Sequence, residues 1–504
     1  MFNCTLLSRS LNVSKNVFQC YCNNVAKNKI NVKGYSKENI IKTYGQPTSN
    51  THPHLIRPGE ITTGIAKHEF EQRRQKFVEK LLTSALKNEN SAKQHIIVIP
   101  SASKSYMSDK IPYVFRQNSD YLYLTGCQEP DTCLVITTTT SSQDYKVILF
   151  LRNKDSHSEL WDGPRTGIED ASNFFGVNQG LPMTELETFL NLYFKSHPQT
   201  MLWYDFLTPI QGNIHNIMKK LQNGMTNNFW DTPVPFVHEL RLIKSPAEIQ
   251  LMQKSCDVAS EAIMKSIIHS KPGSTEHEIF ATVDYECRMN GAEFLAYPPV
   301  VAGGNRATII HYINNNQVVN DGEMVLMDAG CEYHGYSSDI TRTWPINGKF
   351  TPQQRIIYEI VETVQAQIIQ WCAHFPSLDQ LFDSMCILLG KYLQEVGLIP
   401  KKASQKEVIR GAYSFCPHHV SHYLGMDVHD TPSIPRKIKI VPGMIITVEP
   451  GIYISNQLNV PEEFRGIGVR IEDDVLITES GPVVLSAKCR KSREDIEKIA
   501  FYCN

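Results

Sequence analysis

Two segments of this chain that are far apart in the sequence follow one design. Asp321–Asp328 and Pro442–Glu449 each join a glycine-containing turn to an apolar run that ends in a carboxylate, and in both the glycine stands six residues before that carboxylate. A second glycine-containing turn follows each carboxylate. Internal similarity of this kind predicts two structurally alike halves that face one site. A single repeat of this length can also arise by chance, so two unrelated strands are the alternative.

Length and composition set the outer limits. At 504 residues the chain exceeds one ordinary domain, so we expect two domains and a tail. A net charge of −2 gives no indication of a nucleic-acid partner, and no apolar run reaches the length of a membrane span. The 13 cysteines are scattered without a CxxC pair, which indicates free thiols in a reducing compartment.

The N-terminal segment differs in composition from the rest. No acidic residue precedes Glu38, and basic residues are spaced among leucine, valine and phenylalanine in a background of serine, threonine and asparagine. This pattern is typical of a mitochondrial transit peptide, which we predict over residues 1–43. A mitochondrial location follows, with the matrix as the expected compartment and a cytoplasmic form as the alternative. The scarcity of arginine favours the other interpretation, a disordered tail of biased composition.

The next part of the chain predicts an α/β domain. Residues 44–64 are rich in proline, threonine, histidine and asparagine and predict a linker, and residues 65–240 predict the domain itself. A helix is expected near Lys67–Lys87, followed by four strand-like runs: His95–Pro100, Cys133–Thr138, Tyr145–Leu151 and Met201–Tyr204. Three residues here could face a ligand, although packing and domain contact are the favoured interpretation: Arg116, Tyr121 and Trp161.

Residues 241–495 predict an α+β domain in which long helices accompany strands. Capping boxes at Ser245, Thr275 and Thr351 mark three helix starts. A fourth helix is expected to end at Gly397.

Five residues at the ends of strand-like or turn-like runs could bind metal: Asp328, Asp339, His422, Glu449 and Glu472. Carboxylates with one imidazole suit one or two hard or borderline divalent cations, not the thiolate cage of a structural zinc site. Four negative charges would also balance two such cations in a buried site. A strand, a turn and a returning strand would place Asp328 beside Asp339. Taken singly, turn aspartates, core histidines and an exposed acidic turn are the alternatives.

Together these motifs resemble those of the pita-bread metallopeptidases of the aminopeptidase P and prolidase group. The segments that carry the resemblance are Ile310–Tyr312, Met327–Gly330, Ser338–Arg342, His418–Asp430, Val448–Gly451 and Gly468–Asp473. The first domain resembles the aminopeptidase P N-terminal domain, notably at Phe115–Tyr121. The resemblance runs from about Gly59 to Cys489 and implies an α/β N-terminal domain followed by an α+β pita-bread (creatinase/aminopeptidase-like) catalytic domain. The transit-like segment points to the mitochondrial branch of the family.

The resemblance also implies a role for each metal ligand. Two divalent metal ions, most often Mn²⁺, would be held by the five residues, with Asp339 and Glu472 bridging both. Asp328 would bind one ion, and His422 and Glu449 the other. Zinc or cobalt would also accept these ligands. The chemistry implied is activation of a water molecule for attack at neutral pH.

Further roles concern the substrate. Glu449 resembles the family's proton carrier. His311 and His429 resemble the two histidines that hydrogen-bond the peptide carbonyl and the developing oxyanion. The positions that match substrate-binding residues are Tyr297, His311, His418, His429 and Arg470, and a packed turn tyrosine is the alternative for Tyr297.

The implied reaction is removal of one N-terminal residue from a peptide whose second residue is proline. The mitochondrial branch implies a further role, the trimming of imported proteins after presequence removal. A homodimer is expected. Three alternatives stay open: a prolidase that cuts Xaa-Pro dipeptides, a methionine aminopeptidase, which lacks a large preceding domain, and a non-catalytic binding protein on the same fold, which typically loses metal ligands.

Overall fold

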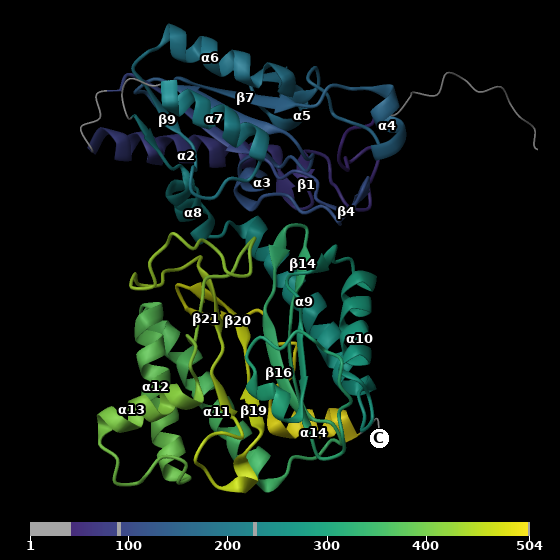
Figure 1. Cartoon of the computed structure of the whole chain (residues 1–504), viewed down its shortest axis with the longest axis vertical. Coiled ribbons are helices and arrows are strands. Elements are labelled where there is room, and N and C mark those ends of the chain that lie inside the picture. The colour runs from purple at the N-terminus through teal and green to yellow at the C-terminus, as the bar shows by residue number, and fades with distance from the viewer. Residues whose placement is uncertain (1–41, 88–91, 225–228, 502–504) are drawn as a thin grey trace, which may run out of the picture. The chain divides into compact units, whose positions relative to one another are not determined.

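Figure 1 shows the computed structural model, which describes residues 42–87, 92–224 and 229–501. Contacts group the chain from Thr43 onward into one unit, and the elements within it form an N-terminal and a C-terminal domain. Apart from its last two positions, the transit-peptide prediction for residues 1–43 falls outside the described residues.

A six-stranded mixed sheet forms the centre of the N-terminal domain. Its order is β10-β9-β3-β6-β7-β8, and the bounds are β3 Gln94–Pro100, β6 Cys133–Thr138, β7 Tyr145–Leu151, β8 Gln179–Pro182, β9 Thr200–Trp203 and β10 Trp230–Asp231. The pairs β3–β6 and β6–β7 are antiparallel, and the outer pairs are parallel. Four of these strands, β3, β6, β7 and β9, confirm the strand-like runs expected from the sequence.

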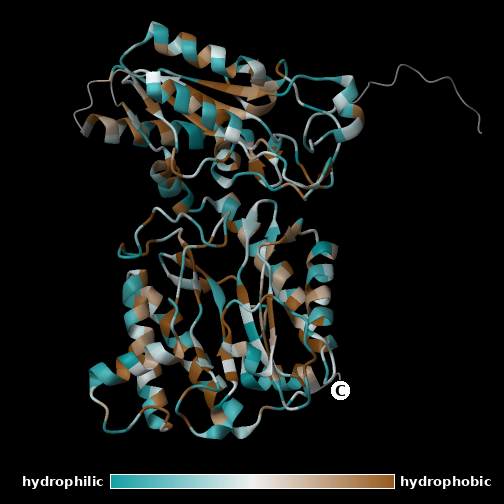
Figure 2. Ribbon diagram, in the orientation of Figure 1, coloured by the Kyte–Doolittle hydropathy of each residue, from teal (hydrophilic) through white to brown (hydrophobic). Residues whose placement is uncertain are grey.

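Helices pack on both faces of this sheet (Figure 1). The helices of this domain are α2 Lys67–Lys87, α3 Ser119–Thr125, α4 Ser156–Asp162, α5 Ala171–Phe175, α6 Leu186–Ser196, α7 Gly212–Gly224 and α8 Val234–Leu242, of which α4 has no buried residue and lies outside the core. Along β3, Ile97 and Ile99 join the core with α2, whereas Ile96 and Val98 join the core with α6 and α7. A strand buried on both faces reads as a continuous apolar run, and Figure 2 shows such runs along this sheet.

The segment predicted as a linker, residues 44–64, packs against the N-terminal domain. The buried Gln46 side chain donates hydrogen bonds to the carbonyls of Ile61 and Gly126. A short pair, β1 (Glu60–Thr62) with β2 (Ile65–Ala66), leads into α2. The segment is therefore folded onto this domain through polar contacts that its composition does not reveal.

Long helices surround the strands of the C-terminal domain (Figure 1). They are α9 Pro246–His269, α10 Glu276–Met289, α11 Pro352–Trp371, α12 Leu378–Glu395, α13 Gln405–Phe415 and α14 Arg493–Phe501. The predicted capping boxes at Ser245, Thr275 and Thr351 are all present. Gly397 follows α12 with a φ of 83°, as a terminating glycine requires. The sequence analysis did not predict α13 and α14.

The strands of this domain form several small antiparallel sheets. One has the order β12-β13-β16 and another β17-β20-β21, and β18 pairs with β19. The bounds are β11 Phe294–Leu295, β12 Val300–Gly303, β13 Met324–Ala329, β14 Cys331–Tyr333, β15 Tyr336–Ser337, β16 Ile340–Pro345, β17 Ile445–Val448, β18 Gly451–Ile454, β19 Ile467–Arg470, β20 Asp473–Thr478 and β21 Gly481–Val484.

The two similar segments of the sequence form equivalent strands. β13 pairs with β16 so that Asp328 lies opposite Thr341, and β17 pairs with β20 so that Val448 lies opposite Asp473. In each pair the first strand carries a carboxylate at or just beyond its end, and another carboxylate directly precedes the second strand. Each pair therefore presents two carboxylates at one end.

The connection between Asp328 and Asp339 is longer than the single turn expected. After Gly330 the chain forms the hairpin β14–β15, which joins β11 in a separate sheet, before it returns as β16. The chain crosses itself closely here, because a Cβ added at Gly330 would lie 1.7 Å from the Ser338 carbonyl oxygen. Glycine is thus required directly after β13, the strand that carries Asp328.

Domain contact proves to be the role of Arg116. Its guanidinium donates to Glu332 Oε2 at 2.6 Å and to Asp427 Oδ1 at 3.0 Å, both in the C-terminal domain. Tyr121 is buried in the N-terminal core, as the packing interpretation predicts. Trp161 is not packed in the core, because 77% of its surface is exposed.

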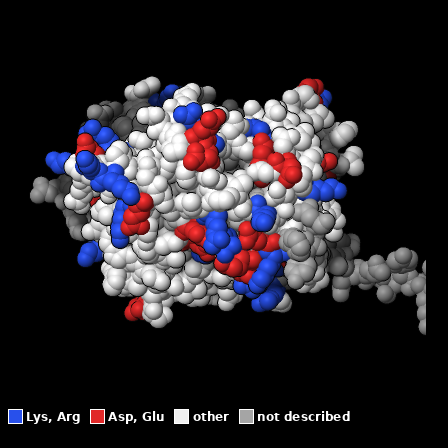
Figure 3. All heavy atoms as spheres, turned by 90° about the horizontal axis from the view of Figure 1, so that it is seen from below, with Lys and Arg blue, Asp and Glu red and all other residues white. Residues whose placement is uncertain are grey.

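The surface and the helices agree with the charge and hydropathy of the sequence. Figure 3 shows acidic and basic side chains interspersed on one face, without a broad area of a single sign. No helix among the described residues has both the length and the apolar character needed to cross a membrane.

We expect Gly330→Ala to lower the free energy of unfolding by about 2–3 kcal/mol, because the new methyl group would overlap backbone that cannot move freely. Gly212→Ala is the matched control, since no atom lies within 4 Å of the added Cβ there. Urea denaturation of both variants measures the difference. Equal stability of the two would show that the crossing at Gly330 is not tightly packed.

Candidate functional site

The ends of the paired strands open into one cavity of about 640 Å³. All five predicted metal ligands line it, together with four of the five predicted substrate-binding residues: His311, His418, His429 and Arg470. Asp328 and Asp339 come from the β13–β16 pair, Glu449 and Glu472 from the β17–β20 pair, and His422 from the segment before β17. A volume of this size suits a small peptide or similar ligand.

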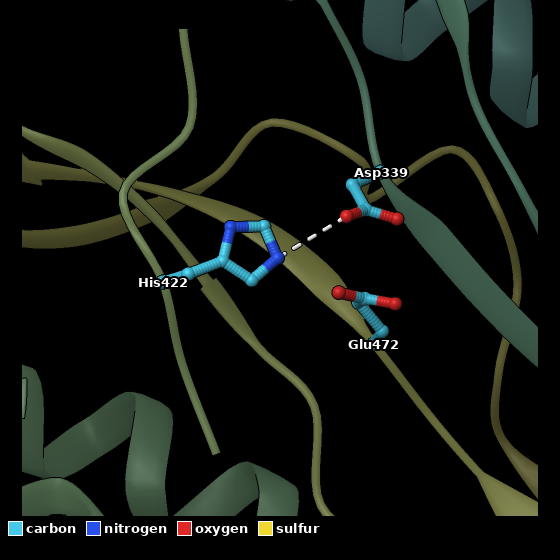
Figure 4. Close-up of side chains that lie close together, drawn as sticks. All are labelled: Asp339, His422 and Glu472. Atoms are coloured by element: carbon cyan, nitrogen blue, oxygen red, sulfur yellow. Dashed lines mark ion pairs between the residues drawn. The ribbon is translucent and has the colours of Figure 1, made fainter. Parts of the chain in front are cut away.

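Asp339, His422 and Glu472 form the tightest group (Figure 4). Each offers one ligand atom, and these atoms all lie within 4.8 Å of one another. The His422 Nε2 atom lies 3.3 Å from Asp339 Oδ2 and 3.6 Å from Glu449 Oε1. His422 Nδ1 lies 3.1 Å from the Tyr423 carbonyl, to which it donates, so Nε2 is left to accept a proton or a cation.

The cavity crowds negative charge in a place with little water. Burial raises the pKa of the Asp339 carboxyl to about 6, and the charge of Asp328 adds to this effect. Burial and the neighbouring carboxylates raise the pKa of Glu472 well above its ordinary value. Burial also raises the pKa of Glu449. These carboxylates need positive charge beside them in order to ionise together.

His422 shows the opposite balance. Burial lowers the pKa of its imidazole, but the hydrogen bond to Asp339 and the charge of Glu449 outweigh burial and raise that pKa to about 9. A proton on His422 therefore supplies part of the missing positive charge when no cation is bound. The side chains of the site, four carboxylates and one imidazole, offer oxygen and nitrogen ligand atoms that suit divalent cations. The residues present thus fit a divalent metal site.

Neighbouring polar groups hold the carboxylates in place. Thr341 Oγ1 donates to Glu472 Oε2 at 2.7 Å. The buried Arg470 guanidinium donates to Asp328 Oδ2 at 2.5 Å and to the Tyr453 hydroxyl at 2.8 Å. Glu449 Oε1 accepts a longer hydrogen bond of 3.3 Å from the Thr447 hydroxyl. The carboxylates are therefore oriented before any ligand arrives.

Tyr297 occupies a different position from the other predicted substrate contacts. Its hydroxyl lies 2.6 Å from Asp328 Oδ1 and 2.5 Å from Asp339 Oδ1, so it stands between two metal-ligand candidates. Its ring lines a separate cavity beside α10. Burial, and then the charges of the two aspartates, raise the pKa of its hydroxyl well above the ordinary value, so it remains a donor. Tyr297 therefore contacts two of the candidate metal ligands, Asp328 and Asp339, and its contact with substrate stays a prediction.

The predicted histidines stand around the carboxylates. His311 and His429 are exposed at the cavity wall. Burial and the nearby charge of His422 lower the pKa of His429, and its ring centroid lies 4.6 Å from that of His422. His418 Nε2 lies 2.8 Å from the Tyr453 hydroxyl. At neutral pH a neutral His429 can donate one hydrogen bond to a carbonyl oxygen in the cavity.

Sequence reasoning missed several supporting residues. Tyr453 joins His418 to Arg470, and Thr341 joins Arg470 to Glu472. Below them the Asp474 carboxylate accepts the backbone N–H of Asp339 at 3.0 Å. Tyr453, Thr341 and Asp474 each lie in or beside a segment that the motifs already marked, but only their partners in space give them a function.

Comparison with known proteins assigns both domains. A family model for metallopeptidase family M24 matches residues 250–479, and a model for the aminopeptidase P N-terminal domain matches residues 70–203. Xaa-Pro aminopeptidase 3 of Rattus norvegicus is 45% identical over 462 residues, which cover 90% of each chain. The mitochondrial intermediate cleaving peptidase 55 of Arabidopsis thaliana is 38% identical over 92% of this chain and 89% of that protein.

Solved structures agree with this assignment. Aminopeptidase P from E. coli with the inhibitor Pro-Leu superposes with a TM-score of 0.77 at 32% identity. The match covers 87% of this chain and 99% of the E. coli chain. Both domains are therefore shared with an enzyme of known structure.

Cation affinity is expected to rise with pH. Below pH 6, protons occupy both Asp339 and His422, and a cation must displace them; between pH 6 and 9 it displaces the His422 proton; above pH 9 neither competes. Calorimetric titration of Mn²⁺ at about pH 5.5, 7.0 and 8.5, in buffers of different ionisation enthalpy, measures affinity and proton release below pH 6 and within the range from pH 6 to 9. His422→Gln should remove the step at higher pH, and His277→Gln, at an exposed histidine on α10, should keep it. An affinity independent of pH would contradict the expectation.

Proposed function

Because this chain belongs to the aminopeptidase P branch of metallopeptidase family M24, we propose that it removes the first residue from peptides whose second residue is proline. The observation that carries the proposal is the cavity in which all five ligand candidates meet the histidines and Arg470. The alignment over 90% of the chain with a protein named Xaa-Pro aminopeptidase 3 supports the same activity. The domain limits we propose are 65–240 for the N-terminal domain and 241–495 for the catalytic domain. Residues 44–64 connect the N-terminal tail to the N-terminal domain.

Two divalent cations, most often Mn²⁺ in this family, are part of the proposal. Asp328, Asp339, His422, Glu449 and Glu472 would hold them. Bound cations would supply Lewis-acid activation of water and of the peptide carbonyl. The protein contributes the fixed orientation of the ligands, through Arg470 on Asp328 and Thr341 on Glu472.

The side chains of the cavity have distinct tasks in the proposed reaction. Glu449, whose pKa burial raises, takes a proton from the attacking water and passes it to the leaving nitrogen. His311 and His429, on the cavity wall, hydrogen-bond the carbonyl of the scissile bond and stabilise the charge that develops on its oxygen. Breaking the C–N bond leaves proline with a protonated secondary amine.

A bond before proline calls for a dedicated site. The tertiary amide has no N–H, so an enzyme that grips an extended backbone loses one hydrogen bond there. Specificity must then come from contacts with the ring and with the free amino terminus. His418, Tyr453 and Arg470, which are joined by hydrogen bonds, form a rigid wall for the proline side of the cavity.

The full-length protein with Mn²⁺ should release one N-terminal residue from Xaa-Pro-Xaa tripeptides, as read by mass spectrometry. Asp339→Asn should abolish turnover while the fold persists, since it removes charge that we assign to both cations. Asp321→Asn, in an exposed turn, is the matched control and should retain activity. Cleavage of Xaa-Pro dipeptides alone would favour a prolidase, and cleavage of neither would favour a binding protein.

A mitochondrial role is the second part of the proposal. The supporting observations are the composition of residues 1–43 and the similarity to the Arabidopsis thaliana intermediate cleaving peptidase named as mitochondrial. We propose that the protein enters the matrix, loses the transit peptide and trims single residues from imported proteins after their presequences are removed. We also propose a homodimer, the commonest closed assembly.

Loss of the protein should lengthen a subset of mitochondrial proteins by one N-terminal residue. Quantitative sequencing of N-termini from mitochondria with and without the protein measures this change. Re-expression of the active protein should restore the shorter termini, and the Asp339→Asn variant should not. N-termini that stay the same after loss of the protein would refute the trimming role.

A further inference from the structure

A buried cluster of charges lies where the two domains meet beside His429. The segment Leu424–Ser433 carries His429 and ends next to the cavity. Its two acidic residues, Asp427 and Asp430, stand on either side of His429 in the sequence. Among the described residues, no hydrogen bond reaches the imidazole of the exposed His429 itself. The position of this histidine therefore depends on how its neighbours in the chain are held.

Arg241, near the end of α8, contacts both acidic residues at once. Its Nη2 donates to Asp427 Oδ2 at 2.8 Å and to Asp430 Oδ1 at 2.5 Å, and its Nη1 donates to Asp120 Oδ1 of the N-terminal domain at 2.6 Å. Only 3% of its surface is exposed. Lys244 Nζ adds a contact of 3.2 Å with the other oxygen of Asp430. One buried guanidinium thus ties together three carboxylates, of which Asp430 is buried and Asp120 and Asp427 are partly exposed.

The N-terminal domain adds neutral and charged donors to the same segment. The Ser119 hydroxyl donates to Asp427 Oδ1 at 2.6 Å, and Arg116 donates to the same oxygen and to the Met426 carbonyl at 2.8 Å. Burial opposes ionisation of Asp427, but the charges of Arg241 and Arg116 outweigh burial and hold the pKa of its carboxyl below the ordinary range. The segment is therefore held from the N-terminal domain as well as from within the catalytic domain, where Ser337 N donates to the Gly425 carbonyl.

The backbone of the segment fits this arrangement and few others. A Cβ at Gly425 would lie 2.4 Å from Asp430 Oδ2, so glycine makes room for the buried carboxylate. Thr431, two residues after His429, has a φ of 49°, which a β-branched residue adopts only when its surroundings impose it. The bonds of Asp430 supply that constraint. Backbone hydrogen bonds hold the rest of the segment, because Leu424 N donates to the Ile445 carbonyl and Asp430 N donates to the Tyr423 carbonyl.

We propose that Arg241 is a positioning residue: it transmits the docking of the N-terminal domain to His429 by fixing Asp427 and Asp430 on either side of that histidine. The inference rests on the proposed function only in assigning His429 a contact with the substrate carbonyl. Removing Arg241 leaves the buried Asp430 and the partly exposed Asp120 and Asp427 without their shared donor, so we expect the segment to rearrange. His429 then moves relative to the cavity, and a misplacement of about 1 Å can cost roughly 100-fold in rate.

A double-mutant cycle in the full-length protein tests the proposal. With an Xaa-Pro-Xaa tripeptide, Arg241→Gln should lower kcat by about 10-fold to 100-fold and change KM far less. In a His429→Ala background the same substitution should change kcat by less than about 2-fold, because its effect runs through the missing imidazole. In a His311→Ala background the full loss should persist. Effects that multiply in the His429→Ala background would overturn the proposal.

Matched controls separate positioning from general loss of stability. Arg74→Gln removes another buried guanidinium, which bonds the carbonyls of Leu124, Phe175 and Gly176 far from the cavity residues, and should lower thermal stability without lowering kcat per folded molecule. Mn²⁺ content should stay unchanged in Arg241→Gln, since two hydrogen bonds with Thr447 hold the His422 backbone on β17. Loss of Mn²⁺ from this variant would overturn the route through His429.

A milder variant covers the case in which Arg241→Gln does not fold. Ser119→Ala deletes one hydrogen bond to Asp427 and leaves every charge in place. It should lower kcat by about 3-fold, again only while His429 is present. An equal loss in the His429→Ala background would contradict the proposal. An unmodified enzyme that cleaves no Xaa-Pro peptide would instead refute the proposed function.

Discussion

Crowding of four carboxylates in one partly buried cavity is the constraint on which the rest of this structure depends. Asp328, Asp339, Glu449 and Glu472 come from two strand pairs whose ends meet, so their repulsion cannot be relieved by moving one side chain into water. Burial raises the pKa of three of them, because their charged forms are unfavourable without a counter-ion. A divalent cation removes that cost and gains ligands in the same step.

The surrounding polar groups are explained by the same constraint. Arg470 neutralises part of the charge on Asp328, and the Tyr297 hydroxyl separates Asp328 from Asp339. Asp474 accepts the backbone N–H of Asp339 and so holds that proposed ligand directly before β16. Each contact restricts a carboxylate that would otherwise turn away from its neighbours. The orientation needed to bind a cation is therefore built into the protein before the cation is present.

The sequence predicts those features that depend on local order along the chain. Helix starts at Ser245, Thr275 and Thr351 follow from capping chemistry within four residues. The strands before Asp328 and Glu449 follow from continuous apolar runs. Contacts such as that of Gln46 with Gly126 join residues whose separation carries no local signal, so composition suggested a linker where the chain is in fact packed. The hairpin β14–β15 was missed for a different reason, because its strands are only three and two residues long.

The domain contact gives a place in this enzyme to the N-terminal α/β domain, which contributes none of the five proposed metal ligands. Arg116 and Ser119 reach from the N-terminal domain to Asp427, while Arg241 joins Asp120 to Asp427 and Asp430. Since buried ion pairs add little stability compared with apolar packing, their value here lies in direction, not in strength. They define one position for a segment that carries an exposed histidine. The first domain thus adds its own contacts to a segment that the catalytic domain also holds, through Ser337 N on the Gly425 carbonyl and Lys244 on Asp430.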